Sequence, residues 1–143
     1  MAETYEQVLP GLSPHLAVND ASAAIDFYKA AFGATELTRH LAPDGKRIMH
    51  ASLSINGGTL MLNDEFPEYT GGKRFAPDAL GGSPVTLHLQ VQDADLVFNQ
   101  AIAAGATVRF ALQDQFWGDR YGQLTDPFGH IWSVGAAKKK MIA

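Results

Sequence analysis

Hydrophobic and polar residues alternate between residues 12 and 18, near the start of the chain. Leu12, Leu16 and Val18 fall on one side of the alternation, and His15 falls on the other. A period of two residues is typical of a strand with one buried and one open face. We therefore expect a half-buried strand that carries a histidine on its open face.

A helical period replaces the alternation after this strand. Asp20 is a residue type that caps helix N-termini, and Gly33 suits the left-handed position that ends a helix. Between them, apolar residues recur at helical spacing: Ala24, Ile25, Tyr28 and Phe32. The pattern predicts a helix from the residues after Asp20 to Phe32.

Three more strands, joined by short turns, are predicted after this helix. Their ranges are 35–41, 46–55 and 59–63. Pro43-Asp44-Gly45 separates the first two, and Asn56-Gly57, a strong hairpin signal, separates the last two. The first half of the chain is thus expected to run strand, helix, and three strands.

The second half repeats this order. His88-Leu89 corresponds to His15-Leu16, Asp93 takes the capping place of Asp20, and Gly-Ala-Thr occurs both at 33–35 and at 105–107. The predicted strands are 85–91, 107–112, 120–125 and 131–134. We therefore predict an α+β fold made of two tandem βαβββ modules.

We expect residues 1–143 to form a single domain with three parts. Module one covers about residues 10–64, a linker covers 65–84, and module two covers 85–135. The linker holds four glycines and three prolines. A connection of this length is either a functional segment that covers a pocket or a plain disordered link.

Composition narrows the function classes. The net charge is −4 and the basic residues are scattered apart from lysines 138–140, so no basic face for nucleic acid is expected. No stretch reaches the about 20 apolar residues of a membrane helix. Glu3 and Glu6 stand where a signal peptide would be apolar, so we expect a cytoplasmic protein. The chain has no cysteine, so a metal would have to bind histidine, carboxylate or water.

Five motifs resemble the vicinal oxygen chelate superfamily (glyoxalase, bleomycin-resistance and extradiol-dioxygenase proteins), and within it the PhnB-like branch. They are residues 24–28, 32–34, 49–51, 117–122 and 126–132. The resemblance implies curved mixed sheets around a cleft, and commonly homodimers that sometimes exchange modules. It does not fix the chemistry, because the superfamily contains isomerases, dioxygenases, transferases and non-catalytic drug binders.

The resemblance also implies where a divalent metal would bind. The expected ligand positions fall on Ser13, Thr86, Ser133 and about Met61, none of which suits such a metal. We therefore expect no cofactor, although a divalent metal remains possible at a site shifted to His15 and His88. Its third ligand would be His50 or Glu65.

His15 and His88 lie two residues beyond the expected ligand positions and so share their face of each strand. Three interpretations stay open: ligands of a shifted metal, polar or general-base groups that act on a substrate together with His50, or satisfied histidines of a structural cleft.

Alternation along the strands places further residues on the cleft face, where they would bind a ligand. These are Ser13, Ser52, Met61, Asn63, Thr86, Gln90 and Ser133. The opposite row of the third strand, facing the helix, would be Met49, Ala51, Leu53 and Ile55.

A second candidate region is the aromatic stretch 116–121. Trp117 and Tyr121 could stack a planar ligand while Arg120 holds its anionic group. Alternatively, Trp117 packs against the sheet end and Arg120 pairs with Asp119 or Asp126. His40 and His130 are expected to be exposed.

Three function hypotheses follow. The first, which we favour, is a metal-free protein of the PhnB-like branch that binds a small polar molecule. The second is a metal-dependent glyoxalase-type lyase, isomerase or dioxygenase. The third is a metal-free enzyme with a histidine as acid or base.

Overall fold

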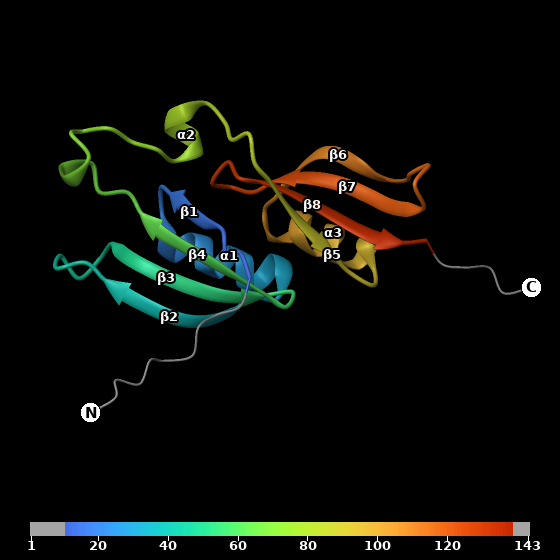
Figure 1. The fold of residues 1–143 in the computed structure, drawn as a ribbon, viewed down its shortest axis with the longest axis horizontal. Coiled ribbons are helices and arrows are strands. Elements are labelled where there is room, and N and C mark those ends of the chain that lie inside the picture. Colours follow the sequence, from blue (N-terminus) through green and yellow to red (C-terminus); the bar gives the residue numbers. More distant parts are fainter. Residues whose placement is uncertain (1–10, 139–143) are drawn as a thin grey trace, which may run out of the picture.

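The computed structural model describes residues 11–138, which form two four-stranded mixed sheets, each with one long helix (Figure 1). Glu3, Glu6 and lysines 139 and 140 lie outside the described residues. The first sheet has the order β1-β4-β3-β2 and the second β5-β8-β7-β6. In each sheet the two strands that come first and last in the chain, β1 with β4 and β5 with β8, pair in parallel, and the other neighbouring strands pair antiparallel. The predicted α+β fold of two tandem βαβββ modules is confirmed.

Module one consists of β1 His15–Val18, α1 Ala21–Phe32, β2 Thr35–Leu41, β3 Ile48–Ile55 and β4 Gly58–Asp64. Module two consists of β5 Thr86–Gln90, α3 Ala94–Ala104, β6 Thr107–Asp114, β7 Asp119–Thr125 and β8 Ile131–Ala137. The segment between them holds a 3-10 turn, η1 Pro67–Tyr69, and a short helix, α2 Pro77–Leu80. Within residues 11–138 no helix is long and apolar enough to cross a membrane.

The local signals act as the sequence predicts. Asp20 and Asp93 each accept a hydrogen bond from a backbone N–H in the first turn of their helix, both at 3.1 Å. Gly33 ends α1 with a φ of 69°. Asn56 and Gly57 have φ values of 48° and 80°, as a tight hairpin turn requires.

The first strand is shorter than predicted. It begins at His15, and Leu12, expected on the buried face, is 95% exposed. Pro14 explains the boundary, because a proline has no N–H to donate to a sheet. Its carbonyl still accepts a hydrogen bond from the Met61 N–H at 2.9 Å.

The row of β3 side chains that face the helix also differs from the prediction. Ile48 is fully buried, whereas Met49 is 42% exposed. The pairing of β2 with β3 shifts between His40 and Leu41, so the simple alternation fails at this end of the strand. The Ile48 N–H donates to Asp64 Oδ2 at 2.7 Å, which fixes the shifted backbone.

Helices α1 and α3 pack together and join the modules behind the sheets. At this junction the buried carboxylate of Asp126 accepts hydrogen bonds from Tyr28 Oη at 2.6 Å and from Trp132 Nε1 at 2.9 Å. The Gln100 side chain of α3 donates to two carbonyls at the end of α1, those of Ala30 and Ala31. The two modules therefore share one core.

Two further hydrogen bonds join the modules in a symmetric way. Asn56 Nδ2, from the β3–β4 turn, donates to the Gln90 carbonyl at 3.0 Å, and His130 Nε2, from the β7–β8 turn, donates to the Ala17 carbonyl at 2.9 Å. The expectation that His130 is exposed is wrong, because this long-range contact buries it.

Candidate functional site

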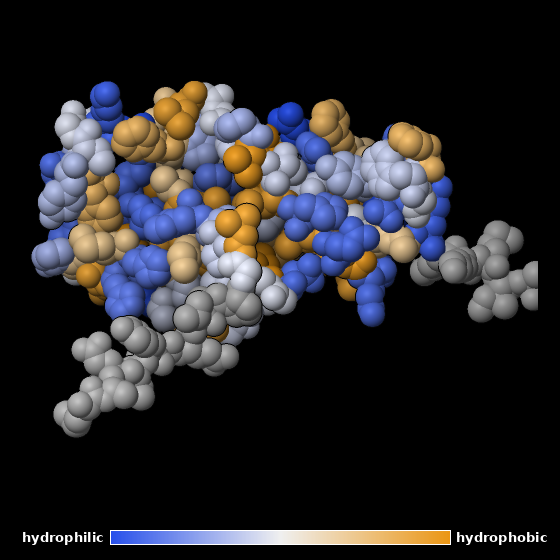
Figure 2. Space-filling view, viewed as in Figure 1, coloured by the Kyte–Doolittle hydropathy of each residue, from blue (hydrophilic) through white to orange (hydrophobic). Residues whose placement is uncertain are grey.

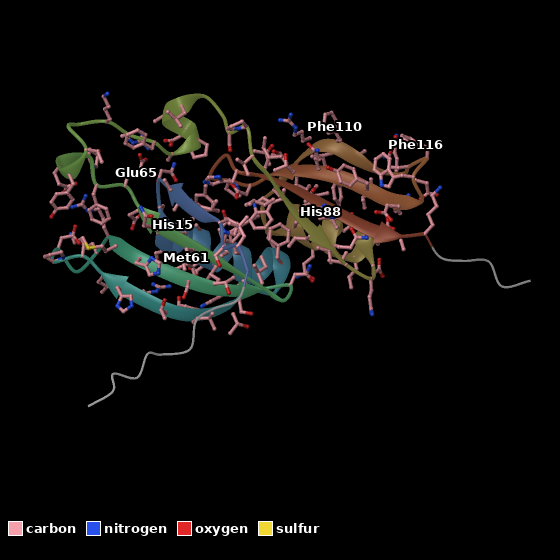
Figure 3. All side chains as sticks on the ribbon, viewed as in Figure 1. His15, Met61, Glu65, His88, Phe110 and Phe116 are labelled. Atoms are coloured by element: carbon pink, nitrogen blue, oxygen red, sulfur yellow. The ribbon has the colours of Figure 1, made fainter. Side chains whose placement is uncertain are left out.

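The candidate site lies on the open faces of the two sheets, which are the faces turned away from α1 and α3. Figure 2 shows mainly hydrophilic residues over both halves of the molecule and a narrow hydrophobic strip between them. His15 and Met61 lie on the open face of module one, and His88 lies on that of module two (Figure 3).

On module one, His15 is held by Asn63. His15 Nε2 and Asn63 Oδ1 are 2.6 Å apart, and Asn63 Nδ2 donates to the Asp64 carbonyl at 2.6 Å. Because the amide oxygen accepts, Nε2 carries the proton and Nδ1 is the free acceptor of the imidazole. The structure thus brings together two residues that were each predicted to face the cleft, His15 and Asn63, and their hydrogen bond fixes which imidazole nitrogen accepts.

His50 and His40 extend this face into a row of three imidazoles. The ring centroids of His15 and His50 are 5.6 Å apart, and those of His50 and His40 are 6.3 Å apart. Partial burial lowers the pKa of His50, and the charges of His15 and His40 lower it further. Among the residues that the structure describes, no hydrogen bond reaches the His50 ring. Sequence reasoning placed His40 at a strand end and missed its stacking on His50.

Ser52, predicted to bind a ligand, is bonded within the sheet. Its hydroxyl lies 2.7 Å from that of Thr38 on β2, and the residue is buried. Met61 pairs with His15 across β1 and β4 and is half-buried. The open face of module one therefore combines free imidazole nitrogens with hydroxyl, amide and thioether groups.

On module two, both ring nitrogens of His88 are bonded to side chains. Nδ1 lies 2.7 Å from Ser133 Oγ, and Nε2 lies 2.8 Å from Gln90 Oε1. The Tyr121 ring stacks on the imidazole with a centroid distance of 5.9 Å. The predicted residues His88, Gln90, Tyr121 and Ser133 thus form one network, in which His88 has no free nitrogen.

The side chains of Trp117 and Arg120 point to different sides of the second sheet. Trp117 is 52% exposed and packs edge-on against Tyr121, which places it beside the open face rather than in the core. Arg120 points to the helix side, where it binds Asp95 at 2.8 Å and Asp114 at 3.4 Å. Neither Asp119 nor Asp126 is its partner, because residues alternate along β7 and Tyr121 takes the open side.

Ser13 and Thr86 stand at the entrances to the first strand of each module. Ser13 precedes β1 and is half-buried, and Thr86 opens β5 and is exposed. Two grooves run beside these strands: one of about 370 Å³ includes His15, Phe75 and Leu87, and one of about 190 Å³ includes Pro14, Thr59 and His88.

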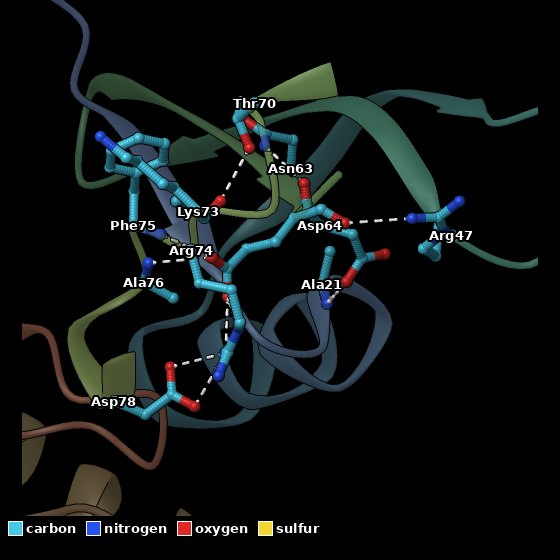
Figure 4. Close-up of polar contacts among 12 residues, drawn as sticks. Ala21, Arg47, Asn63, Asp64, Thr70, Lys73, Arg74, Phe75, Ala76 and Asp78 are labelled. Atoms are coloured by element: carbon cyan, nitrogen blue, oxygen red, sulfur yellow. Dashed lines mark hydrogen bonds and ion pairs between the residues drawn. The ribbon is translucent and has the colours of Figure 1, made fainter. Parts of the chain in front are cut away.

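Glu65, the other candidate metal ligand, lies at the start of the linker (Figure 3) and organises it. Figure 4 shows the polar contacts of this segment around Arg74, Phe75, Ala76 and Asp78. Its carboxylate binds the Arg74 guanidinium at 2.6 Å and accepts the backbone N–H groups of Phe75 at 2.7 Å and Ala76 at 3.2 Å. The side chain is only 10% exposed. Its oxygens are therefore engaged in holding the loop.

The donor set does not fit the metal that the resemblance implies. Within residues 11–138 no group of three or more His, Asp or Glu side chains is placed to hold a metal ion. Ser133, at a ligand position, bonds His88 instead, and Glu65 is engaged by Arg74. His15 and His88 lie on different sheets.

The sequence matches the family profile of the Glyoxalase/Bleomycin resistance protein/Dioxygenase superfamily over residues 8–134. An uncharacterised protein of Mycobacterium bovis is 60% identical over 128 residues, which cover 90% of this chain and 84% of that protein. TioX from Micromonospora sp. ML1 has a similar structure, with a TM-score of 0.66 and 30% identity, over 93% of this chain and 100% of TioX. A PhnB protein from Bacillus cereus shares the fold, with a TM-score of 0.69 and 19% identity, over 90% of this chain and 100% of that one.

Proposed function

Because the chain belongs to the glyoxalase/bleomycin resistance protein/dioxygenase superfamily, we propose that it binds a small polar molecule on its open sheet faces, without the usual metal site of that superfamily. The observation that carries the proposal is the network around His88. Ser133 and Gln90 form hydrogen bonds to both nitrogens of the imidazole. Ser133 also occupies a position where the superfamily resemblance implies a metal-binding carboxylate. Such a network orients polar groups toward a ligand and leaves no lone pair of His88 for a metal.

Binding is tested by NMR with a library of small metabolites and drugs against the isotope-labelled protein. We expect shift changes that centre on His15, His50, His88 and Tyr121, and a loss of affinity in His88→Ala. Lys29→Gln, an exposed change on α1, serves as the control with unaltered binding. A library without a single binder at these faces would contradict the proposal.

The claim that the protein lacks the usual metal site is tested on protein purified without a histidine tag. We expect metal well below one equivalent and a thermal unfolding curve that a chelator does not shift. One equivalent of divalent metal that disappears in His15→Ala and His88→Ala would support the alternative, a metal-dependent glyoxalase-type lyase, isomerase or dioxygenase at a shifted site.

One observation supports a second function, metal-free acid–base catalysis. The pKa of His50 is lowered, and its ring has no hydrogen-bond partner within residues 11–138, so it is a neutral base at pH 7. Any turnover found with a bound ligand should survive chelator, vanish in His50→Gln, and fall only as the pH drops below the ordinary histidine range. Turnover that persists in His50→Gln would remove this second function.

A further inference from the structure

Arg109 is a candidate binding residue that the motifs of the sequence did not single out, and it lies at an irregular point of β6. Val108 pairs with Leu124 and Phe110 with Gln123, so Arg109 is the extra residue of a bulge in β6. Val108 lies opposite Leu124, which is buried on the helix side, so alternation from Val108 puts Arg109 on the other side of the strand. Arg109 consequently reaches the open face of module two, where its Nε donates to Gln123 Oε1 at 3.0 Å.

This contact connects Arg109 to the network around His88. Gln123 Nε2 donates to the Tyr121 hydroxyl at 2.9 Å, and the Tyr121 ring stacks on His88. The guanidinium also lies over the Phe110 ring, with its carbon 5.4 Å from the centroid. The side chain is thus positioned by its neighbours although it is exposed.

Arg109 differs from the other arginines in its charge partners. All five arginines of the chain lie within residues 11–138, and four of them bind at least one carboxylate: Arg39, Arg47, Arg74 and Arg120. Among the residues that the structure describes, the hydrogen-bond partner of the Arg109 side chain is the neutral amide of Gln123, and this bond uses Nε alone. Both Nη groups therefore keep their donors for an incoming anion.

The surroundings of Arg109 suit an anion. A groove of about 460 Å³ lies between Arg109 and the end of the linker, and none of the described residues that line it is acidic. Its walls carry the hydroxyls of Ser83 and Thr125 and the backbone of Gly81 and Gly82. A carboxylate placed here would meet a fork of two N–H donors and nearby hydroxyls without repulsion from an acid.

We propose that Arg109 is the anion-recognition residue of module two, and that the ligand is a small organic acid whose carboxylate pairs with the two Nη groups. This assignment rests on the proposed function, because it names the chemical class of the molecule that the open face binds. Phosphate shares the required chemistry, so the test treats it as a separate arm.

The test uses matched pairs of small carboxylic acids and their primary amides, together with inorganic phosphate. NMR titration of the labelled protein gives the affinity of each probe. We expect the acids to bind more tightly than their amides, and Arg109→Gln to weaken the acids at least about tenfold while leaving the amides unchanged. Arg109→Lys should recover only part of the loss, since an ammonium lacks the planar fork.

Arg39→Gln is the control, because Arg39 is exposed on the corresponding strand of module one and already pairs with Glu36 at 2.7 Å. It should leave both probe sets unaffected. Amides that bind as well as acids, or acids that bind Arg109→Gln unchanged, would overturn the role of Arg109 and leave the proposed binding function intact. Binding of phosphate without binding of acids would overturn the carboxylate assignment. If neither set perturbs the open faces, the proposed function itself fails.

Discussion

The geometry of His88 depends on the absence of a side chain at Gly135. A Cβ built there would lie 2.9 Å from His88 Cε1 and 3.0 Å from Gln90 Oε1. Gly135 thus leaves the space in which the imidazole and the amide meet. The backbone at Gly135 does not have a positive φ, so its conformation does not require glycine. The space that the side chains of His88 and Gln90 occupy is what requires the absence of a Cβ.

We predict that Gly135→Ala displaces His88 from Ser133 and weakens ligand binding, with a stability cost of about 1–3 kcal/mol from overpacking. The ring ¹⁵N shifts of His88 and a denaturant titration measure the two effects. Gly58→Ala is a suitable control, since a Cβ there meets only the Ile55 carbonyl at 3.6 Å. Unchanged His88 shifts in Gly135→Ala would refute this account of the network.

Because of Tyr28, the free energy of unfolding is expected to decrease at alkaline pH. Burial raises its pKa well above the ordinary value of 10.0, and the charge of Asp126 raises it further. The folded state therefore holds the proton after the unfolded chain has released it, so stability is full below about pH 10 and falls as the pH rises further.

We predict that Tyr28→Phe costs about 1.5–3 kcal/mol at neutral pH, because Asp126 loses a hydrogen-bond donor. It should also flatten the decline in stability above about pH 10. Urea unfolding at a series of pH values measures both effects, with the exposed Tyr69→Phe as the comparison. Equal alkaline slopes in wild type and Tyr28→Phe would contradict the assignment.

At the scale of elements, the conformation of the linker depends on one side chain, that of Glu65. Glu65 binds Arg74 and caps the backbone at Phe75 and Ala76, and α2 then packs on module two, where a Cβ at Gly129 would lie 2.7 Å from Pro77 Cβ. The segment predicted as either a cover or a disordered link is therefore a bonded loop that lines the groove beside Arg109.

We predict that Glu65→Gln loosens this loop while global unfolding changes little. Trypsin should cleave after Lys73 or Arg74 several times faster than in wild type, because the Arg74 guanidinium is released from its carboxylate. Glu68→Gln removes an ion pair of Arg47 from the same segment but leaves Arg74 held, and should cleave at the wild-type rate. Equal rates for the two variants would show that Glu65 does not order the loop.

The elements themselves were predictable, because each has a local cause. Caps at Asp20 and Asp93, the Asn56-Gly57 turn and the period of each segment all act within a few residues. Apart from the start of β1, which Pro14 sets, the errors occurred where residues distant in the sequence decide which side chain is buried. A shifted pairing buries Ile48 in place of Met49, and a contact across the modules buries His130. Alternation identified the network of His88, whereas the role of Arg109 depends on its contact with Gln123 and on the absence of a carboxylate partner within residues 11–138, which no strand pattern shows.

The described residues expose large apolar side chains on both modules, and aromatic ones among them lie on module two. Phe116 is 96% exposed and Phe110 is 56% exposed, and both stand at β6 and its turn (Figure 3). Exposed aromatic residues of this size favour a contact with another protein surface. We propose that a second copy of the chain covers them, as the expected homodimer would.

Light scattering after gel filtration should then give about twice the chain mass of 15.4 kDa. Phe110→Asp combined with Phe116→Asp should give a monomer that remains folded. Leu96→Asp, a change on α3 where the side chain is 62% exposed, should leave the dimer intact. A monomeric wild type would refute the homodimer, and a dimeric double variant would place the interface elsewhere.

The hydrogen bond from Tyr28 to Asp126 spans 98 residues of sequence. During synthesis on the ribosome, the aromatic face of α1 therefore emerges long before the carboxylate and the indole that complete its surroundings. We expect the first half of the nascent chain to stay without stable tertiary structure until most of the second half has been translated. The repeat in the sequence thus does not amount to two units that mature one after the other.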